Sequence, residues 1–217
     1  MDVVFDNFDV FVDGFRTTVS LTLLSAVGAL LLGTLIAAMR VSPVPPLRWA
    51  GATYVQLIRN TPLTVVFFLV VFGLPEVDVR LPFFRLAVLA LSLYTAAFVA
   101  EAVRSGINSV ATGQAEASRS IGMTFGQTLR LVVLPQAFAN ILPPLASVFI
   151  AMLKNTSIAS AFFVFEGIQA MNQLINSFGN AVVPILIAAA AGYLFLAVLS
   201  SVLFGLLERT VRVGGAR

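Results

Sequence analysis

The sequence predicts an all-α integral membrane protein with about five transmembrane helices. Of its 217 residues, 59% are hydrophobic and only 11% are charged, and the mean hydropathy is +0.99. A typical soluble domain has about 25% charged residues. The apolar residues also form long runs without charge, and about 20 such residues suffice to cross a bilayer. Most of the few cations lie at the ends of these runs, which is typical of residues that set membrane topology.

The first expected span covers Thr17–Met39, a charge-free run between Arg16 and Arg40. Residues 1–16 are acidic and lack the basic start of a cleaved signal peptide, so we expect them to form an extracytoplasmic N-terminal segment. After the span, the proline-rich stretch RVSPVPPLRW cannot continue a helix and is expected to be a connector.

The second expected span covers Thr61–Leu74, within a helix that starts near Gly51. The short sequence PEVDVRLP is expected to turn the chain toward a third span, Phe84–Val103. The fourth and fifth spans are expected at Ala137–Leu153 and Ala181–Leu207, with a mixed, half-buried segment between them.

Arginine residues set the expected orientation, because cytoplasmic loops carry an excess of Lys and Arg. With the N-terminus outside, the cytoplasmic side holds Arg40, Arg48, Arg104, Arg119, Arg130, Arg209, Arg212 and Arg217. We therefore expect a multi-pass protein of the bacterial plasma membrane. Its transmembrane domain would cover residues 17–207, with a cytoplasmic polar loop over residues 113–135 and a cytoplasmic tail over residues 208–217.

The chain contains no cysteine and no histidine. Their absence excludes thiol nucleophiles, disulfides, Cys/His metal sites and a Ser-His-Asp triad. The scattered cations also do not favour a nucleic-acid partner. If catalysis powers this protein, we expect it on another chain, and we expect no metal or cofactor on this one.

The polar loop has the local signals of a helix–turn–helix. Gln114–Ser120 has helix-forming composition, and Gly122 can end that helix in a left-handed conformation. Thr124 can cap a second helix, with Gln127 in position for a capping box. We expect Leu134-Pro135 to end this second helix. An interfacial loop and a docking element for a soluble partner both fit the pattern.

The segment from Glu116 to Pro135, EASRSIG…VVLP, resembles the EAA loop of ABC importer permeases. In that family the pattern is Glu-Ala-Ala, three residues, Gly, nine residues, Ile, one residue and Leu-Pro. The chain keeps every spacing, with Ser118 for the second Ala and Val132 for the Ile. The stretches RNTPLTVVFF, YTAAFVAEAVRSGINSV and LKNTSIAS extend the similarity to polar amino acid permeases, most of all to actinobacterial glutamate permease subunits.

This resemblance implies the transmembrane domain of a type I ABC importer for polar amino acids, working by alternating access. Glutamate is the expected substrate, with glutamine or another polar amino acid as the alternative. The implied partners are a second permease subunit, expected to form a heterodimer, a dimeric cytoplasmic ATPase that binds ATP and Mg²⁺, and an extracytoplasmic amino-acid-binding protein. The chain itself would be a non-catalytic subunit.

By the same resemblance, the loop residues expected to contact the ATPase are Gly113, Gln114, Ala115, Glu116, Ala117, Ser118, Gly122, Met123 and Phe125. Glu116 would anchor to a polar rim of the ATPase. The small residues would keep the helix thin enough to enter a groove, and Met123 and Phe125 would add apolar contacts.

Polar and charged residues within or beside the spans are candidates for substrate binding. They are Arg59, Asn60, Thr61, Arg85, Glu101, Lys154, Asn155, Thr156 and Ser157. Simpler structural roles stay open: Arg85 can snorkel, Glu101 can pair with Arg104 at (i, i+3) spacing, and Pro62 alone can explain a kink after Arg59.

Asn155 carries the substrate argument. Related permeases often have Asp at this position, and an Asp would favour an amino group or a cationic side chain. A neutral Asn leaves Lys154 less compensated, which would favour an anionic substrate.

An ion-coupled secondary carrier is the alternative of another class. Such carriers usually have more spans and inverted repeats, and the sequence shows neither. A permease of an ABC importer should retain an ATPase on purification, whereas a carrier should not.

Overall fold

The computed structural model describes residues 2–214, with side chains for residues 2–211. The α-helices are α1 Asp2–Asp6, α2 Phe8–Val41, α3 Pro45–Arg59, α4 Leu63–Phe68, α5 Leu74–Glu76, α6 Phe83–Asn108, α7 Thr112–Ser120, α8 Phe125–Thr128, α9 Leu134–Asn155, α10 Gly167–Ser177 and α11 Val182–Gly214. Two π-helical segments, η1 Leu69–Gly73 and η2 Leu129–Val133, and one 3₁₀ segment, η3 Thr156–Phe162, interrupt or extend them.

Among the described residues, four helical stretches are long and apolar enough to cross a membrane. They are Phe8–Val41, Phe83–Asn108, Phe125–Phe162 and Val182–Val211, and the pair α3 with α4–α5 makes a fifth if its bent arms count as one span. The part of the chain that the structure describes contains no strand. The expected all-α membrane fold with about five spans is therefore confirmed.

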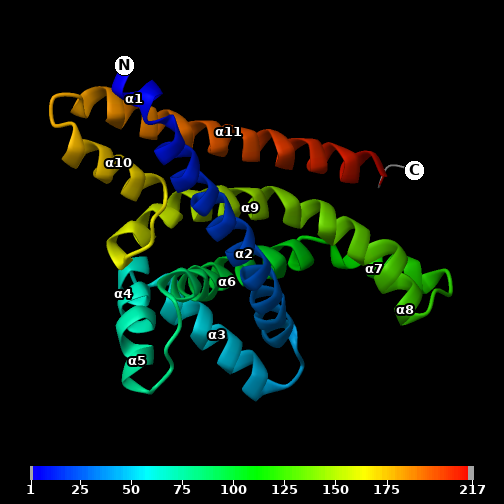
Figure 1. The fold of residues 1–217 in the computed structure, drawn as a ribbon. Coiled ribbons are helices and arrows are strands. Elements are labelled where there is room, and N and C mark those ends of the chain that lie inside the picture. Colours follow the sequence, from blue (N-terminus) through cyan, green and yellow to red (C-terminus); the bar gives the residue numbers. More distant parts are fainter. Residues whose placement is uncertain (1, 215–217) are drawn as a thin grey trace.

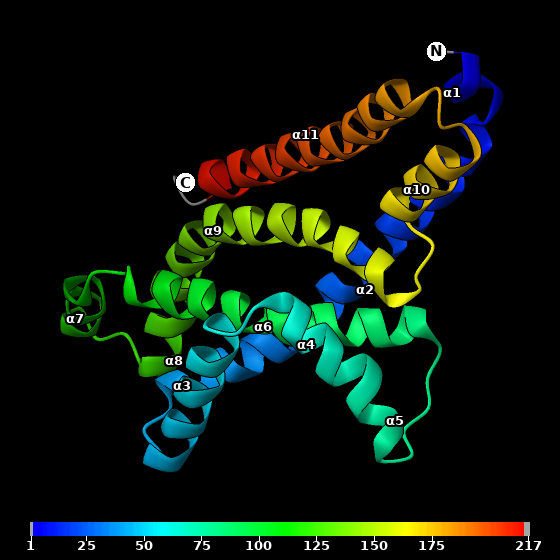
Figure 2. The same cartoon turned by 90° about the vertical axis from the view of Figure 1, so that its left-hand side faces the viewer.

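Helix α6 lies at the centre of the molecule, and α2, α3, α4 and α9 pack around it (Figures 1 and 2). In the most apolar 18-residue stretch of α6, 61% of the residues are buried, against 11% in the corresponding stretch of α11. The loop formed by α7 and α8 lies at the same end of the molecule as the end of α11, and α1 and α5 lie at the opposite end.

Close approach of α2 and α6 depends on small residues. A Cβ added to Gly33 would lie 2.8 Å from the carbonyl oxygen of Ala96 and 2.6 Å from Val99 Cβ. The Ser25 hydroxyl also donates to the carbonyl of Val88 at 3.4 Å across the same interface. Packing of this kind stabilises helix pairs in a bilayer, where apolar burial alone gives little driving force.

Helix α2, which contains the first expected span, begins earlier than that span, at Phe8. Phe11 and Phe15 continue its apolar face and pack with α10 and α11. The charged residues of this stretch are exposed on the surface of the helix, and Arg16 pairs with Asp13 at 3.2 Å. Of the acidic residues that suggested a separate segment, Asp9 and Asp13 lie on α2, while Asp2 and Asp6 lie on the short helix α1.

The expectation of a single helix from Gly51 through Leu74 is wrong. The chain bends by 107° between α3 and α4. Pro62 cannot donate a backbone hydrogen bond. Asn60 and Thr61 return their side chains to the last turn of α3, donating to the carbonyls of Gln56 and Leu57 at 2.8 Å each.

The expectation that Leu134-Pro135 ends the second loop helix is also wrong. The helix runs on from Phe125 through η2 into α9. The amide of Leu134 reaches back five residues to the carbonyl of Leu129, and Pro135 falls in the first turn of α9. The wider π turn accommodates a proline that would clash in a regular helix.

Candidate coupling loop and substrate pocket

The loop between α6 and α9 begins with α7, which ends in a Schellman motif. Gly122 has a φ of 88°, as expected. Its amide donates to the carbonyl of Arg119 at 3.0 Å, and the amide of Met123 donates to that of Ser118 at 3.2 Å. These two bonds satisfy carbonyls at the helix end and fix the direction of the turn.

The second arm of the loop starts with the expected capping box. The hydroxyl of Thr124 accepts a hydrogen bond from the backbone amide of Gln127 at 3.3 Å. The side-chain oxygen of Gln127 accepts one from the backbone amide of Thr124 at 2.9 Å. Ser118 donates to the Thr128 hydroxyl at 3.1 Å, and both side chains are buried. The two arms are therefore held together as one rigid unit.

The surface of this unit contains most of the residues expected to contact an ATPase. The exposed ones are Gly113, Gln114, Glu116, Ala117, Gly122 and Phe125, and the half-buried ones are Ala115 and Met123. Ser118 differs, because it is buried and holds α7 to α8. Ile121, which the motif did not point to, is 79% exposed, and Phe125 is 75% exposed.

A charge cluster lies where α2, α3 and α6 meet. The Glu101 carboxylate accepts from Arg40 and Arg104 at 2.5 Å each, one guanidinium on each oxygen. Arg59 approaches the same carboxylate at 3.6 Å. The expected Glu101–Arg104 pair is confirmed, and the Arg40 contact, 61 residues away in sequence, has no local signal.

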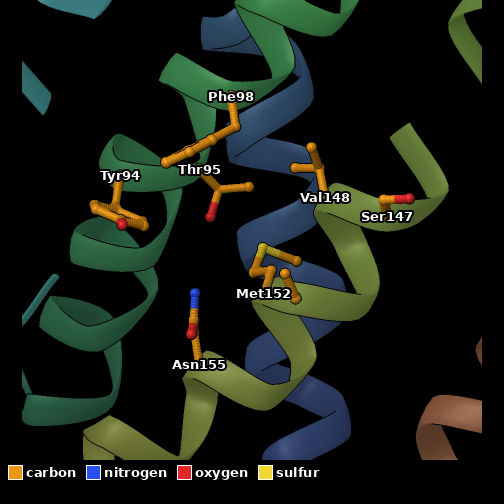
Figure 3. Close-up of a pocket in the computed structure, with 8 residues that line it drawn as sticks. Tyr94, Thr95, Phe98, Ser147, Val148, Met152 and Asn155 are labelled. Atoms are coloured by element: carbon orange, nitrogen blue, oxygen red, sulfur yellow. The ribbon is translucent and has the colours of Figure 1, made fainter. Parts of the chain in front are cut away.

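A pocket of about 310 Å³ lies between α6 and α9. Its lining residues are Tyr94, Thr95, Phe98, Ser147, Val148, Ala151, Met152 and Asn155. Thr95 and Asn155 turn their polar ends toward one another inside it (Figure 3). Of the expected substrate residues, Asn155 is the one that lines this pocket, and Phe98 connects it to Arg59, whose guanidinium lies 5.6 Å from the ring centroid.

The remaining candidates do not converge on this pocket. Lys154 is exposed, and the hydroxyls of Thr156 and Ser157 donate to backbone carbonyls of their own helix at 2.6 and 2.7 Å. Arg85 is exposed at the start of α6, and Asn60 and Thr61 cap α3. The role proposed for Lys154 beside Asn155 thus lacks support from the position of its side chain.

A buried acidic residue, Glu166, was missed in the sequence. It is 0% exposed and accepts from the backbone amides of Ile168 and Gln169 at 2.8 and 3.1 Å, which caps α10. Tyr193 of α11 also donates to its carboxylate, and the Thr18 hydroxyl of α2 lies 3.5 Å from it. An acidic residue before Gly167 in a mixed segment was the available signal, but its partners are distant in sequence.

Comparison with known proteins agrees with these features. Residues 29–213 match the family described as binding-protein-dependent transport system inner membrane component. The chain belongs to this family.

Three individual proteins illustrate the relationship. The permease is 39% identical over 211 residues to the probable glutamine ABC transporter permease protein GlnM of Bacillus subtilis, covering 96% of each chain. It is 42% identical over 197 residues to the glutamate transport system permease protein GluC of Corynebacterium glutamicum, covering 84% of this chain and 85% of the other. A crystal structure of an amino acid ABC transporter with histidines superimposes with a TM-score of 0.88 at 35% identity, covering 95% of this chain and 96% of that one.

The permease is therefore a membrane subunit of an ABC importer with the fold of a type I transmembrane domain. Its family is non-catalytic, and ATP hydrolysis is the work of a partner chain. Membership of the family implies an ATPase and a substrate-binding protein as partners. The secondary-carrier alternative is thereby excluded.

Proposed function

We propose that this permease imports a polar amino acid, with glutamate as the expected substrate, and that residues 113–135 couple it to the ATPase. The rigid, exposed loop is the observation that carries this function. Its Schellman turn and capping box hold Glu116, Gly122 and Phe125 on one projecting unit at the end of the molecule.

Loop and pocket share a continuous helix, which suggests how coupling works. The chain stays helical from Phe125 through η2 to Asn155, so the loop lies at one end of this rod and a pocket residue at the other. Closure of the ATPase dimer would move the loops of two permease subunits together. The continuous helix would then tilt and change the shape of the pocket. Such a change between two packed arrangements would give alternating access.

The proposed orientation places the loop and the C-terminus in the cytoplasm of a bacterial cell and the N-terminus outside. The second permease subunit is proposed to be a different chain, as the resemblance to glutamate permease subunits suggests. ATP and Mg²⁺ would bind to the ATPase, and this chain would hold no cofactor.

The substrate preference rests on the pocket. Asn155 offers a neutral amide where an Asp would repel an anionic side chain. The relatives include both a glutamate and a glutamine permease at similar identity, so glutamine is the alternative substrate.

Asn155→Asp tests this preference. We expect glutamate uptake by the reconstituted complex to fall about tenfold, because one new negative charge beside the substrate costs roughly 1.4 kcal/mol. Asn140→Asp is the matched control, since Asn140 lies on the same helix, is exposed and does not line the pocket. Unchanged glutamate uptake by Asn155→Asp would count against an anionic substrate at this position.

A further inference from the structure

The cluster around Glu101 contains more cations than its carboxylate needs. Arg40 and Arg104 each bond one of the two oxygens at 2.5 Å, so both oxygens already have a charged donor. Arg59 lies 3.6 Å from Oε2, which is too long for a normal hydrogen bond. Three guanidinium groups and one carboxylate leave a formal surplus of two positive charges.

Arg59 is the most accessible of the three arginines. Its side chain is 45% exposed, against 15% for Arg40 and 33% for Arg104. It can therefore leave Glu101 without stranding an unpaired carboxylate, because the other two arginines remain. Removal of Arg40 or Arg104 would not have this property, since each holds an oxygen of its own.

The position of Arg59 connects this surplus charge to the pocket. Its guanidinium carbon lies 5.6 Å from the centroid of the Phe98 ring, and Phe98 is part of the pocket wall. The eight residues that line the pocket include no cation. A carboxylate in the pocket could therefore bind the Arg59 guanidinium, if the Arg59 side chain turned past the Phe98 ring to reach it.

We propose that Arg59 binds a carboxylate of the transported amino acid, while Arg40 and Arg104 hold Glu101. A guanidinium offers two parallel N–H donors that match a carboxylate, and such charge-assisted pairs are stronger than neutral hydrogen bonds. This inference rests on the proposed function as an amino acid importer. The carboxylate can be the α-carboxylate that every amino acid carries or the side-chain carboxylate of glutamate.

The test is equilibrium binding of radiolabelled glutamate and glutamine to the purified complex in nanodiscs, without the binding protein. Leaving out the binding protein matters because its own affinity would otherwise dominate the measured constant. For Arg59→Gln we expect the dissociation constant for glutamate to rise at least about tenfold, which is the loss expected for a charge-assisted hydrogen bond. Arg59→Lys should retain part of the affinity, because it keeps the charge and loses the planar fork.

The two substrates distinguish the two carboxylates. A rise for glutamate alone identifies the side-chain carboxylate, and an equal rise for glutamate and glutamine identifies the α-carboxylate. Arg48→Gln is the matched control, because Arg48 is an exposed arginine in the first turn of α3, the helix that ends with Arg59. Its dissociation constants should stay within twofold of the wild type.

Unchanged dissociation constants in Arg59→Gln would overturn the proposal, and so would an absence of binding to the wild-type complex at millimolar concentration. A loss of affinity in Arg59→Gln accompanied by a clear fall in the midpoint of thermal unfolding, absent in the control variant, would also overturn it, because that result indicates a structural role. Uptake by the wild-type complex with its binding protein is measured separately. If that complex transports no amino acid, the proposed function itself fails, whatever the Arg59 variants do.

Discussion

At the scale of single residues, the buried contacts of Thr18 show how polar groups join two helices, α2 and α10. Its hydroxyl accepts the amide of Gly167 at 3.1 Å and lies 3.5 Å from the Glu166 carboxylate. It also donates to the carbonyl of Gly14 in its own helix. The neighbouring Thr17 is half-buried, and its hydroxyl donates within its own helix, in an exposed hydrogen bond to the carbonyl of Asp13 at 3.2 Å.

These two threonines make a matched pair of variants. Thr18→Val should lower the free energy of unfolding by about 1–3 kcal/mol, because the Gly167 amide would lose its buried acceptor. Thr17→Val should change it by less than about 0.5 kcal/mol, since the hydrogen bond of that side chain is exposed. Thermal unfolding of the purified complex measures both. Equal midpoints for the two variants would show that the buried cluster contributes little.

Residue-level prediction from sequence succeeded where the partner was near in the chain. The (i, i+3) spacing of Glu101 and Arg104 indicated their ion pair, which is confirmed. The bonds of Glu166 to Tyr193 and of Arg40 to Glu101 join different helices, so no local pattern could predict them. The position of the Asn155 side chain in a pocket likewise depends on how α6 and α9 pack.

At the scale of elements, the glycine of the loop turn has a specific conformational role. Gly122 is the described glycine with a positive φ, and open space surrounds the place where its side chain would be. A residue with a Cβ is disfavoured there by about 1–2 kcal/mol. The proposed docking to the ATPase would leave no room for added bulk or charge.

Gly122→Asp is therefore expected to abolish amino acid uptake while the chain still inserts in the membrane. Gly126→Ala is the control, because Gly126 also faces open space but lies in helix α8 without a positive φ. That variant should keep near-normal uptake. Membrane-fraction immunoblots report insertion, and normal uptake by Gly122→Asp would contradict the assignment of this loop.

The interface of α2 and α6 gives a second prediction at this scale. Gly33→Val should prevent stable accumulation of the permease, because the new side chain would meet the Ala96 carbonyl and Val99 in the most buried helix pair. Gly205→Val in α11 should accumulate normally, since nothing lies within 4 Å of that position. Comparable amounts of both variants in the membrane would argue against tight α2–α6 packing.

The existence of the helices was predictable, while the exact ends of several helices and the size of their bends were not. Long apolar runs located the spans, and Gly122 and the Thr124–Gln127 pair located the loop turn because these signals act within a few residues. Pro62 indicated a kink after Arg59, but the size of the bend, 107°, depends on how α3 and α4 each pack against α6. Pro135 indicated a helix end, but the π turn before it absorbs the proline.

At the scale of the whole molecule, the permease has a well-buried central helix, α6, and an open outer helix, α11. In the most apolar 18-residue stretch of each helix, 61% of the residues are buried in α6 and only 11% in α11. Large exposed apolar residues such as Leu194, Phe195 and Val202 lie on α11. Such surface is stable in a bilayer, where lipid or a neighbouring membrane chain covers it. The arrangement suits a subunit that works within a larger complex.

One measurement tests the central claim most directly, that this chain couples amino acid import to a partner ATPase. The complex is purified through the permease, reconstituted with its binding protein, and its ATPase activity is titrated with glutamate, glutamine, aspartate and arginine. We predict that an ATPase is retained and that glutamate stimulates it most. If no ATPase remained bound, or if no amino acid stimulated hydrolysis, the proposed role of the loop in amino acid import would be contradicted.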